Sequence, residues 1–338
     1  MKTDNANLRY VLTQFGLETC RPADIEFLGT AGGFSGAAFW RLATPNGPIC
    51  LRRWPPEHPT RERLAWIHGV LRHVEKTGFA LTPVPISAHS GDSFVDHDRH
   101  FWEMTPWLSG SADYDRAPSR QRLEAAMATL AEFHVAAASV PGCLPRNDKS
   151  PGIASRLDQL RSLKNEGCDQ IEKKLSQAHS DWQQLVERSH RVLACFRSLV
   201  DSVEHDLARQ QNLVSPLQVC IRDIWHDHVL FTGDSVSGIV DFGAMRVESV
   251  AGDVARLVGS LVADDEKGWQ IGIDAYQEVR PLVLTQQQLI RTFDRSSVLM
   301  SGMNWLTWIF LEDRQFRDRE TIIARLDRIL MRLQGVCR

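Results

Sequence analysis

Two acidic residues, Asp223 and Asp241, carry the clearest chemical signal in the sequence. Asp223 lies in the segment "CIRDIWHDHVLF", five residues before His228, and Asp241 follows the apolar run in "SGIVDFGAMR". Apolar, strand-like residues flank both positions, so we expect a hairpin to bring the two carboxylates together. Paired carboxylates can hold Mg²⁺ and can take the proton of a hydroxyl group. The pattern therefore indicates metal-assisted chemistry on a hydroxyl.

A glycine-rich turn near the N-terminus is the second candidate feature. The segment "GTAGGFSGAAFW" places Gly29, Gly32, Gly33 and Gly36 between two strand-like runs. Glycines let backbone N–H groups approach phosphate oxygens closely. Most glycine-rich hairpins are only turns, so this segment alone is a weak indicator of phosphate binding.

Taken in order, these segments resemble the aminoglycoside phosphotransferase and choline kinase-like family, whose members have the protein-kinase fold. Kinases carry a catalytic loop H-R-D-x-x-x-x-N followed by D-F-G. This chain has "IRD" ending at Asp223, His228 at the Asn position, and "DFG" starting at Asp241. The segments "LAEFHVAA" and "AGDVARL" are similar to the family's helices before and after this motif. The resemblance covers about residues 25–260, and its specific part runs from Asp223 to Asp253.

The resemblance implies a role for each matching residue. Asp223 would accept or orient the proton of the substrate hydroxyl, as the catalytic residue. Asp241 would hold Mg²⁺ bridging the phosphates of ATP, and His228 would occupy the second metal position. Asp253 would brace the catalytic loop. Nucleotide-binding residues would be Gly32, Gly33, Ser35, Gly36, Arg52, Glu103 and Met104, with residues 103–107 receiving adenine through backbone groups.

Several positions depart from the family pattern. Ile221 stands where the family has His, and His228 stands where it has Asn. Imidazole suits Mn²⁺ better than Mg²⁺, so Mn²⁺ is an alternative metal. Arg52 replaces the expected strand lysine, and it binds phosphate with a different reach and geometry. The helix glutamate that would pair with it is missing: Ile67 or His68 falls at its place, and Glu62 lies one to two turns earlier.

Two other functions remain open at this point. The altered positions are compatible with a kinase-fold protein that binds nucleotide with weak or no catalysis. Alternatively, His226 and His228 together with Asp223 and Asp227 are candidate ligands of a metal-dependent hydrolase, because residues two apart on a strand share one face. By contrast, we interpret His134, Trp305 and Trp308 as core residues.

The elements around these motifs predict an α+β, bilobal protein-kinase-like fold. Strand-like runs flank the glycine-rich turn, and "GPICLRRW" predicts a third strand. Thr60 caps a helix to about Lys76, and Gly78 ends it. Further strands are expected around residues 84–90 and 101–105. Helical periods then dominate, at 120–138, over 154–211 and near the C-terminal end, with a loop at 141–153.

From this pattern we predict three parts. Residues 1–102 form a nucleotide-binding lobe, residues 103–110 a hinge, and residues 111–338 a helical lobe. The helical lobe contains the catalytic loop (219–243) and a helical insert (about 154–211). ATP and a divalent metal would bind in the cleft between the lobes.

The amino-acid composition limits which classes of binding partner and which cellular location we expect. The 338 residues carry 39 Lys and Arg against 42 Asp and Glu, a net charge of −3, so charge gives no reason to expect nucleic acid or an anionic membrane. No run approaches the roughly 18 apolar residues of a membrane span, and the first residues form no apolar signal segment. The 7 cysteines are dispersed, which is typical of reduced thiols in a cytoplasm. The sequence therefore predicts a cytoplasmic, ATP-dependent phosphotransferase acting on an unidentified small-molecule hydroxyl.

Overall fold

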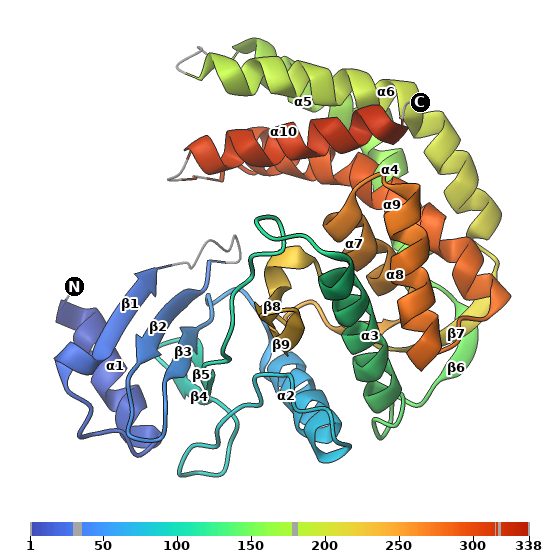
Figure 1. Ribbon diagram of the computed structural model, residues 1–338. Helices are drawn as coiled ribbons and strands as arrows, with labels where there is room; N and C mark the ends of the chain where they lie inside the picture. The colour runs from blue at the N-terminus through green and yellow to red at the C-terminus, as the bar shows by residue number, and fades with distance from the viewer. Residues whose placement is uncertain (1, 30–35, 178–181, 315, 317–318, 337–338) are drawn as a thin grey trace. The chain divides into compact units, whose positions relative to one another are not determined.

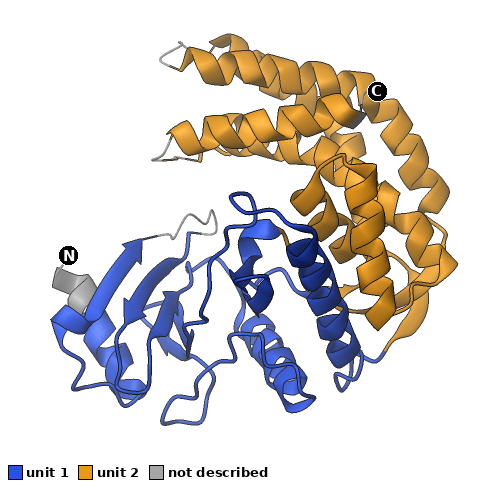
Figure 2. Cartoon of the chain, in the orientation of Figure 1, with its two compact units in different colours: residues 1–144, 226–245 blue, residues 145–225, 246–338 orange. Residues whose placement is uncertain are grey.

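The chain divides into two compact units, which are shown in separate colours in Figure 2. A computed structural model describes residues 2–29, 36–177, 182–314, 316 and 319–336. Unit 1 comprises residues 1–144 and 226–245, and unit 2 comprises residues 145–225 and 246–338. Residues 111–144 and 226–245 therefore group with the N-terminal sheet, because α3 (Arg120–Ala137) packs against α2 (Arg61–Lys76) and β9 (Ser235–Ile239). The division into lobes at residues 103–110 stays a prediction.

Unit 1 is built on a five-stranded antiparallel sheet in the order β1-β2-β3-β5-β4 (Figure 1). A separate antiparallel pair, β8 and β9, lies within the predicted catalytic loop (219–243). Besides α2, α3 and β9, the elements of unit 1 are α1 (Lys2–Gln14), a 3₁₀ turn (Pro22–Asp24), β1 (Ile25–Gly29), β2 (Ala38–Leu42), β3 (Ile49–Arg53), β4 (Val95–His97), β5 (His100–Pro106), a 3₁₀ turn η3 (His226–His228) and β8 (Val229–Thr232).

The helix α2 forms as its sequence predicts. The Thr60 side chain accepts a hydrogen bond from the Arg63 N–H at 3.2 Å, which satisfies a backbone donor at the helix start. The apolar stripe of α2 is buried, and it consists of Leu64, Ile67, Leu71 and Val74. Gly78 follows the last turn with φ +101°, a conformation that glycine adopts without strain.

One strand prediction differs from the structure, and two other local features complete the comparison with the sequence. No strand forms over residues 84–90, because Pro83 and Pro85 lack the N–H groups that a ladder needs; Ile86 alone donates to Met104, at 2.8 Å. The expected hinge begins inside a strand, since residues 103–106 pair with residues 49–52 of β3. Helix α1 was not predicted, because its segment is mostly polar.

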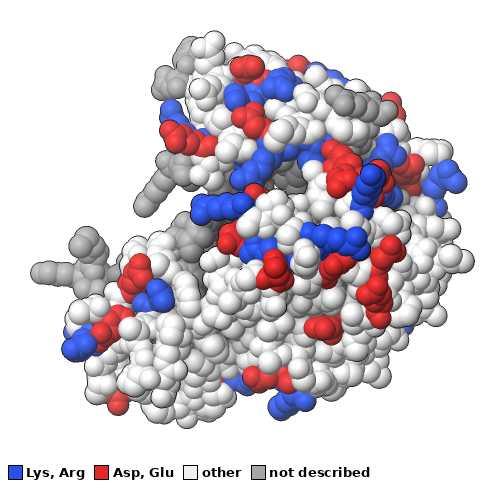
Figure 3. Space-filling view, viewed as in Figure 1, with Lys and Arg blue, Asp and Glu red and all other residues white. Residues whose placement is uncertain are grey.

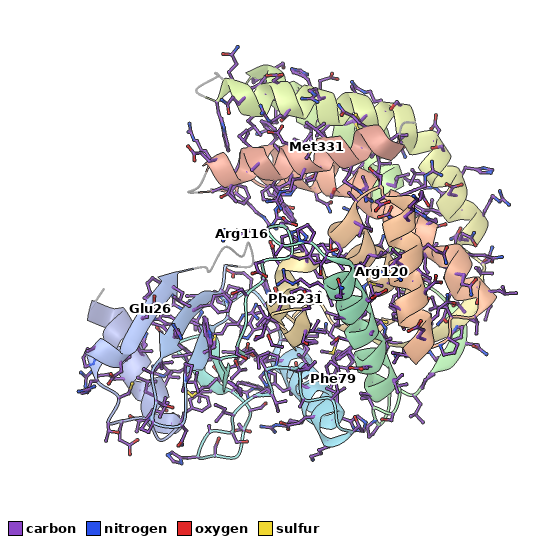
Figure 4. All side chains as sticks on the ribbon, in the orientation of Figure 1. Glu26, Phe79, Arg116, Arg120, Phe231 and Met331 are labelled. Atoms are coloured by element: carbon purple, nitrogen blue, oxygen red, sulfur yellow. The ribbon has the colours of Figure 1, made fainter. Side chains whose placement is uncertain are left out.

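The core of unit 1 lies between α1 and one face of the large sheet. Trp40, Trp102 and Met104 are buried there together with Leu8 and Val11 of α1. On the other side of the unit, Phe79 packs edge-on against Phe133 of α3, with ring centroids 5.7 Å apart (Figure 4). Apolar contacts therefore hold α1 against the sheet and hold the segment after α2 against α3.

Unit 2 is mainly helical. Helix α9 packs against α7, α6 and α10, and a small sheet in the order β10-β7-β6 carries the chain to the catalytic-loop segment. Its elements are β6 (Arg146–Lys149), α4 (Pro151–Ser162), a π-helical turn (Leu163–Gly167), α5 (Cys168–Gln177), α6 (Gln183–Gln210), β7 (Val214–Cys220), β10 (Arg246–Glu248), α7 (Ala251–Val262), α8 (Glu266–Val279), α9 (Leu284–Leu306), a second π-helical turn (Thr307–Leu311) and α10 (Arg319–Val336). The expected helices over 154–211 and at the C-terminal end are confirmed, whereas the expected loop at 141–153 contains β6 and the start of α4.

Surface charge and helix composition give two further observations. On the face drawn in Figure 3, Lys and Arg side chains lie among Asp and Glu side chains instead of forming one basic field. Within the described part of the chain, no helix combines the length and apolar character needed to cross a membrane.

Candidate active site

Unit 1 contains a pocket of about 300 Å³. Its walls are largely apolar, and they come from the sheet, from α2, from residues 83–85 and from residues 230–243; they include Leu28, Phe39, Leu71, Pro85, Leu230 and Val240. Burial raises the pKa of the Cys50 thiol in this lining to about 11, so the thiol stays uncharged. A pocket of this size and polarity suits a planar heterocycle.

Charged groups gather at one part of the lining. Arg52 of β3 has its Nη1 atom 3.8 Å from Glu103 Oε1 and 3.6 Å from Asp241 Oδ1. Both distances are longer than a direct hydrogen bond. Arg52 thus lies between two carboxylates without being tightly bound to either.

Two aromatic rings restrict the orientation of the Arg52 guanidinium plane. Its central carbon lies 3.4 Å from the ring centroid of Trp54 and 5.1 Å from that of Phe39. A guanidinium stacks on aromatic faces in this way, whereas a lysine ammonium does not have the planar shape to do so. The Nε atom of Arg52 is buried, and no described residue accepts a hydrogen bond from it.

Glu103 is fixed by a second set of contacts. His68 Nε2 lies 2.7 Å from Glu103 Oε2, and His68 Nδ1 lies 2.8 Å from Ser93 Oγ. Burial raises the pKa of the Glu103 carboxyl, but the His68 hydrogen bond and the Arg52 charge outweigh burial and hold that pKa below its ordinary value. Glu103 is therefore an ionised carboxylate inside the protein.

The β8–β9 hairpin brings two predicted metal ligands together. His228 Nε2 lies 3.8 Å from Asp241 Oδ2, and the Val240 N–H donates to the His228 carbonyl at 2.9 Å. Asp241 has φ +62°, a left-handed conformation that is strained for a residue other than glycine. Strain of this kind is common where a side chain must be aimed at a ligand.

The first part of the predicted catalytic loop, residues 219–225, lies in unit 2, and Asp253 of α7 braces it. The two Asp253 oxygens accept from the Ile221 N–H at 2.6 Å and from the Arg222 N–H at 2.8 Å. Arg222 has φ +76°, so these bonds support a strained turn directly before Asp223. Asp223 itself forms an ion pair with Arg256 of α7. Both acidic groups and Arg256 thus set the shape of the loop.

The surroundings of Ile221 explain why this position departs from the family pattern. Ile221 is fully buried and contributes its backbone N–H to Asp253. Arg222, expected to make a local ion pair, donates from Nη1 to the buried Glu248 at 2.6 Å. Glu248 also accepts from Ser150 and Gly152. An apolar residue at 221 therefore satisfies the packing while the backbone keeps its support.

The remaining predicted nucleotide-binding residues belong to the glycine-rich turn and to strand β5. Gly32, Gly33 and Ser35 lie outside the described residues, and Gly36 is exposed with φ +76°. Met104 does not line the pocket: side chains alternate along a strand, so Met104 is buried in the core while Glu103 and Thr105 face the pocket. Met104 was expected to receive adenine through its backbone groups, and a buried side chain leaves that prediction as it stands.

The two histidines of the hydrolase hypothesis have different partners. Residues 226–228 form a 3₁₀ turn, not a strand, so a spacing of two does not place their side chains on one face. His226 Nε2 lies 3.2 Å from Asp115 and from Asp227, whereas His228 lies near Asp241. The assumption behind the hydrolase hypothesis is wrong for this segment.

The other residues singled out from the sequence fall into two groups. His134 and Trp305 are buried, as expected for core residues, and Trp308 lies edge-on to Trp305 with ring centroids 5.3 Å apart. Trp54, Ser93 and the His68–Glu103 contact were missed. Trp54 is the last residue of the predicted third strand, which was the one available signal; the His68–Glu103 contact joins residues 35 apart.

The antiparallel sheet with its pocket, and the helical unit with a braced catalytic loop, define a protein-kinase-like α+β phosphotransferase. A model of the phosphotransferase enzyme family (APH) matches residues 26–283, and the chain belongs to this family of small-molecule kinases. A homoserine kinase of Janthinobacterium sp. (strain Marseille) is 26% identical over 308 residues, covering 88% of this chain and 83% of the relative.

Solved structures agree with this fold. The AMP-bound spectinomycin phosphotransferase aligns with a TM-score of 0.66 at 12% identity, covering 98% of both chains. An amicoumacin kinase in complex with AMP-PNP and Ca²⁺ aligns with a TM-score of 0.60 at 13% identity, covering 94% of this chain and 90% of that structure. At these identities the comparison establishes the fold alone.

Proposed function

We propose that this protein transfers the terminal phosphoryl group of ATP to the hydroxyl of a small amino-acid-like acceptor, with homoserine as the first acceptor to test. The observation that carries the proposal is the pocket of unit 1, whose apolar walls end at Arg52 and Asp241. The homoserine kinase relative, aligned over most of both chains, supports the choice of acceptor.

Each part of the pocket has a distinct task in this proposal. The apolar walls around Leu28 and Leu230 take the purine ring. Arg52 binds phosphate oxygens, because a guanidinium offers parallel N–H donors to an oxyanion. Phosphoryl transfer depends mostly on positioning and charge neutralisation, so a fixed cation at this place contributes directly.

Asp241 and His228 are suited to hold a divalent cation. A carboxylate oxygen is a ligand that Mg²⁺ prefers, whereas an imidazole suits Mn²⁺ better, so this pair favours a site that accepts either metal. Their side-chain atoms are 3.8 Å apart, close enough for both to approach one ion. When bound, the cation would supply positive charge to the phosphates.

Asp223 is the proposed acceptor of the hydroxyl proton. Its side chain is about half exposed (49%), and its ion pair with Arg256 fixes the direction of the carboxylate. Asp253 holds the preceding backbone through two hydrogen bonds. A braced, partly exposed carboxylate is what general-base catalysis on a small acceptor requires.

The second candidate is a nucleotide-binding protein of the same fold with weak or no catalysis. The observation that favours it is the imidazole of His228 in place of an amide ligand. The two functions differ in turnover, whereas both require nucleotide binding.

An acceptor screen distinguishes the two functions. Purified protein with ATP, and with Mg²⁺ or Mn²⁺ in separate reactions, is incubated with homoserine, choline, a sugar and an aminoglycoside while ADP formation is followed. We expect ADP to form faster with homoserine than without an acceptor. ATP binding without acceptor-dependent ADP formation under either metal would favour the non-catalytic protein.

A further inference from the structure

The carboxylate beside Arg52 comes from the neighbouring strand and not from a helix. Arg52 of β3 and Glu103 of β5 are directly opposite each other in the antiparallel register. Directly opposed residues have Cβ atoms about 5 Å apart, so oppositely charged side chains in such a pair interact across the strands. The pairing is thus a property of the sheet itself.

Glu103 is held from both of its oxygens. Oε2 contacts His68 at 2.7 Å and Oε1 faces Arg52 at 3.8 Å. His68 in turn contacts Ser93 at 2.8 Å, and both His68 and Glu103 are at least nine-tenths buried. Burying a carboxylate is costly unless it is paired and hydrogen-bonded, so these contacts leave Glu103 little freedom to move.

The geometry of Arg52 shows what a fixed Glu103 accomplishes. The Nη1 corner of the guanidinium faces Glu103 and Asp241, and the rings of Trp54 and Phe39 restrict its plane. Its buried Nε atom has no acceptor among the described residues. The Nε–H is therefore a donor of Arg52 that no described residue uses, and a phosphate group accepts the N–H donors of a guanidinium well.

Helix α2 contributes the imidazole of His68, and no carboxylate, to the surroundings of Arg52 and Glu103. Glu62, the carboxylate of α2 nearest in sequence to the expected position, is exposed and does not line the pocket. In protein kinases the strand lysine pairs with a helix glutamate, and the position of the helix controls that pair. Here Arg52 and Glu103 are opposed by the register of β3 and β5, so the pair does not depend on a helix carboxylate. Helix α2 acts on the pair only through the contact of His68 with Glu103.

We propose that Glu103, held by His68, is the positioning residue that orients the Arg52 guanidinium toward the phosphate groups of a bound nucleotide. The inference rests on the proposed function, because it assumes that the pocket binds ATP. It assigns His68 and Glu103 a role in recognising polyphosphate and none in recognising the purine or the acceptor.

The test compares ATP with adenosine by isothermal titration calorimetry on the full chain. For Glu103→Gln we expect about tenfold weaker ATP binding, equal to about 1.4 kcal/mol, with adenosine binding unchanged. His68→Leu, which leaves Glu103 and Arg52 in place, should weaken ATP binding in the same selective way, and His68→Gln, whose amide can donate to Glu103, should recover part of the loss. Glu62→Gln is the matched control and should bind both ligands like the wild type.

The outcomes separate positioning from simple electrostatics. If Glu103 acted only through its charge, its removal would reduce repulsion of the phosphates and tighten ATP binding, and His68→Leu would have no selective effect. Tighter or unchanged ATP binding by Glu103→Gln would overturn the inference, and so would equal losses for ATP and adenosine. Should Glu103→Gln fail to fold, the His68 pair of variants decides. A wild-type protein that binds ATP no better than adenosine would instead refute the proposed phosphate site.

Discussion

Replacing Arg52 by lysine tests whether the pocket is built around a guanidinium. Lysine is the residue that the kinase pattern expects here, so a degraded kinase would gain function from the change. The structure predicts a loss. The stacking distance of 3.4 Å to Trp54 depends on a planar group, while Glu103 and Asp241 both face its Nη1 atom and leave its other N–H groups for phosphate oxygens.

The expected size of the loss follows from the donors involved. Lysine keeps the charge but offers a single ammonium in place of two neighbouring N–H groups. A hydrogen bond to a charged group contributes about 1.5–3 kcal/mol, so the loss of one such bond weakens ATP binding by roughly 10- to 150-fold. Adenosine binding should change little, since Arg52 lies at the polar part of the pocket.

The neighbouring Arg53 supplies the matched control. It lies on the opposite face of β3, where its guanidinium is 5.7 Å from the ring centroid of Trp40 and 5.5 Å from that of Trp102. Arg53→Lys therefore makes the same chemical change beside aromatic rings, outside the pocket. Calorimetry should give wild-type ATP affinity for Arg53→Lys. An Arg52→Lys protein that binds ATP as tightly as wild type, or more tightly, would refute the reasoning.

Three further predictions concern other parts of the chain. Gly110→Ala should lower the free energy of unfolding by about 1–3 kcal/mol in urea denaturation, because φ is +99° and a Cβ would lie 2.6 Å from the Phe231 carbonyl oxygen. Gly142→Ala is the control, since Gly142 has φ +76° but open space around it, and it should lower the free energy of unfolding less. Equal losses for the two variants would contradict the steric argument. Asp253→Asn should reduce turnover by roughly 100-fold through a misplaced catalytic loop while ATP affinity stays the same, and a loss of affinity in place of turnover would contradict this. Burial raises the pKa of Asp294 from 3.8 to about 6, so the stability that this group contributes is fully present below pH 3.8 and is lost as pH rises through about 6. The unfolding free energy of wild type relative to Asp294→Asn should therefore fall between about pH 4 and pH 6 and then level off, and a rise over this range would show the sign to be wrong.

Local sequence signals predicted much of the fold. The Thr60 cap and the apolar stripe of the following residues were enough to place α2 between its true ends. Alternation and turn residues likewise located β1, β2 and β3. Where local signals conflicted, as at residues 84–90, the prolines decided against a strand despite the apolar residues around them.

The candidate site was predictable only where its residues lie close in sequence. His228 and Asp241, which the resemblance assigned to the metal, come together through one hairpin. The spacing argument had instead paired Asp241 with Asp223, whose ion pair in the structure is with Arg256 of α7. The partner of Arg52 could not be found in this way, because Glu103 is brought opposite it by the register of two strands that are distant in sequence. The resemblance placed Ile67 or His68 where the family has its helix glutamate, but it did not select His68, since a buried histidine on a helix has the same pattern as a core residue.

The most direct test of the account is phosphoryl transfer by Asp223→Asn, compared with wild type. With ATP, a divalent metal and homoserine, ³¹P nuclear magnetic resonance follows ATP, ADP and the phosphorylated acceptor in one sample. We expect a phosphorylated acceptor from the wild type, one for each ADP formed, and a rate about 10²- to 10⁴-fold lower for the variant with ATP affinity retained. Transfer by Asp223→Asn at the wild-type rate would contradict the assignment of Asp223 as the base that takes the hydroxyl proton.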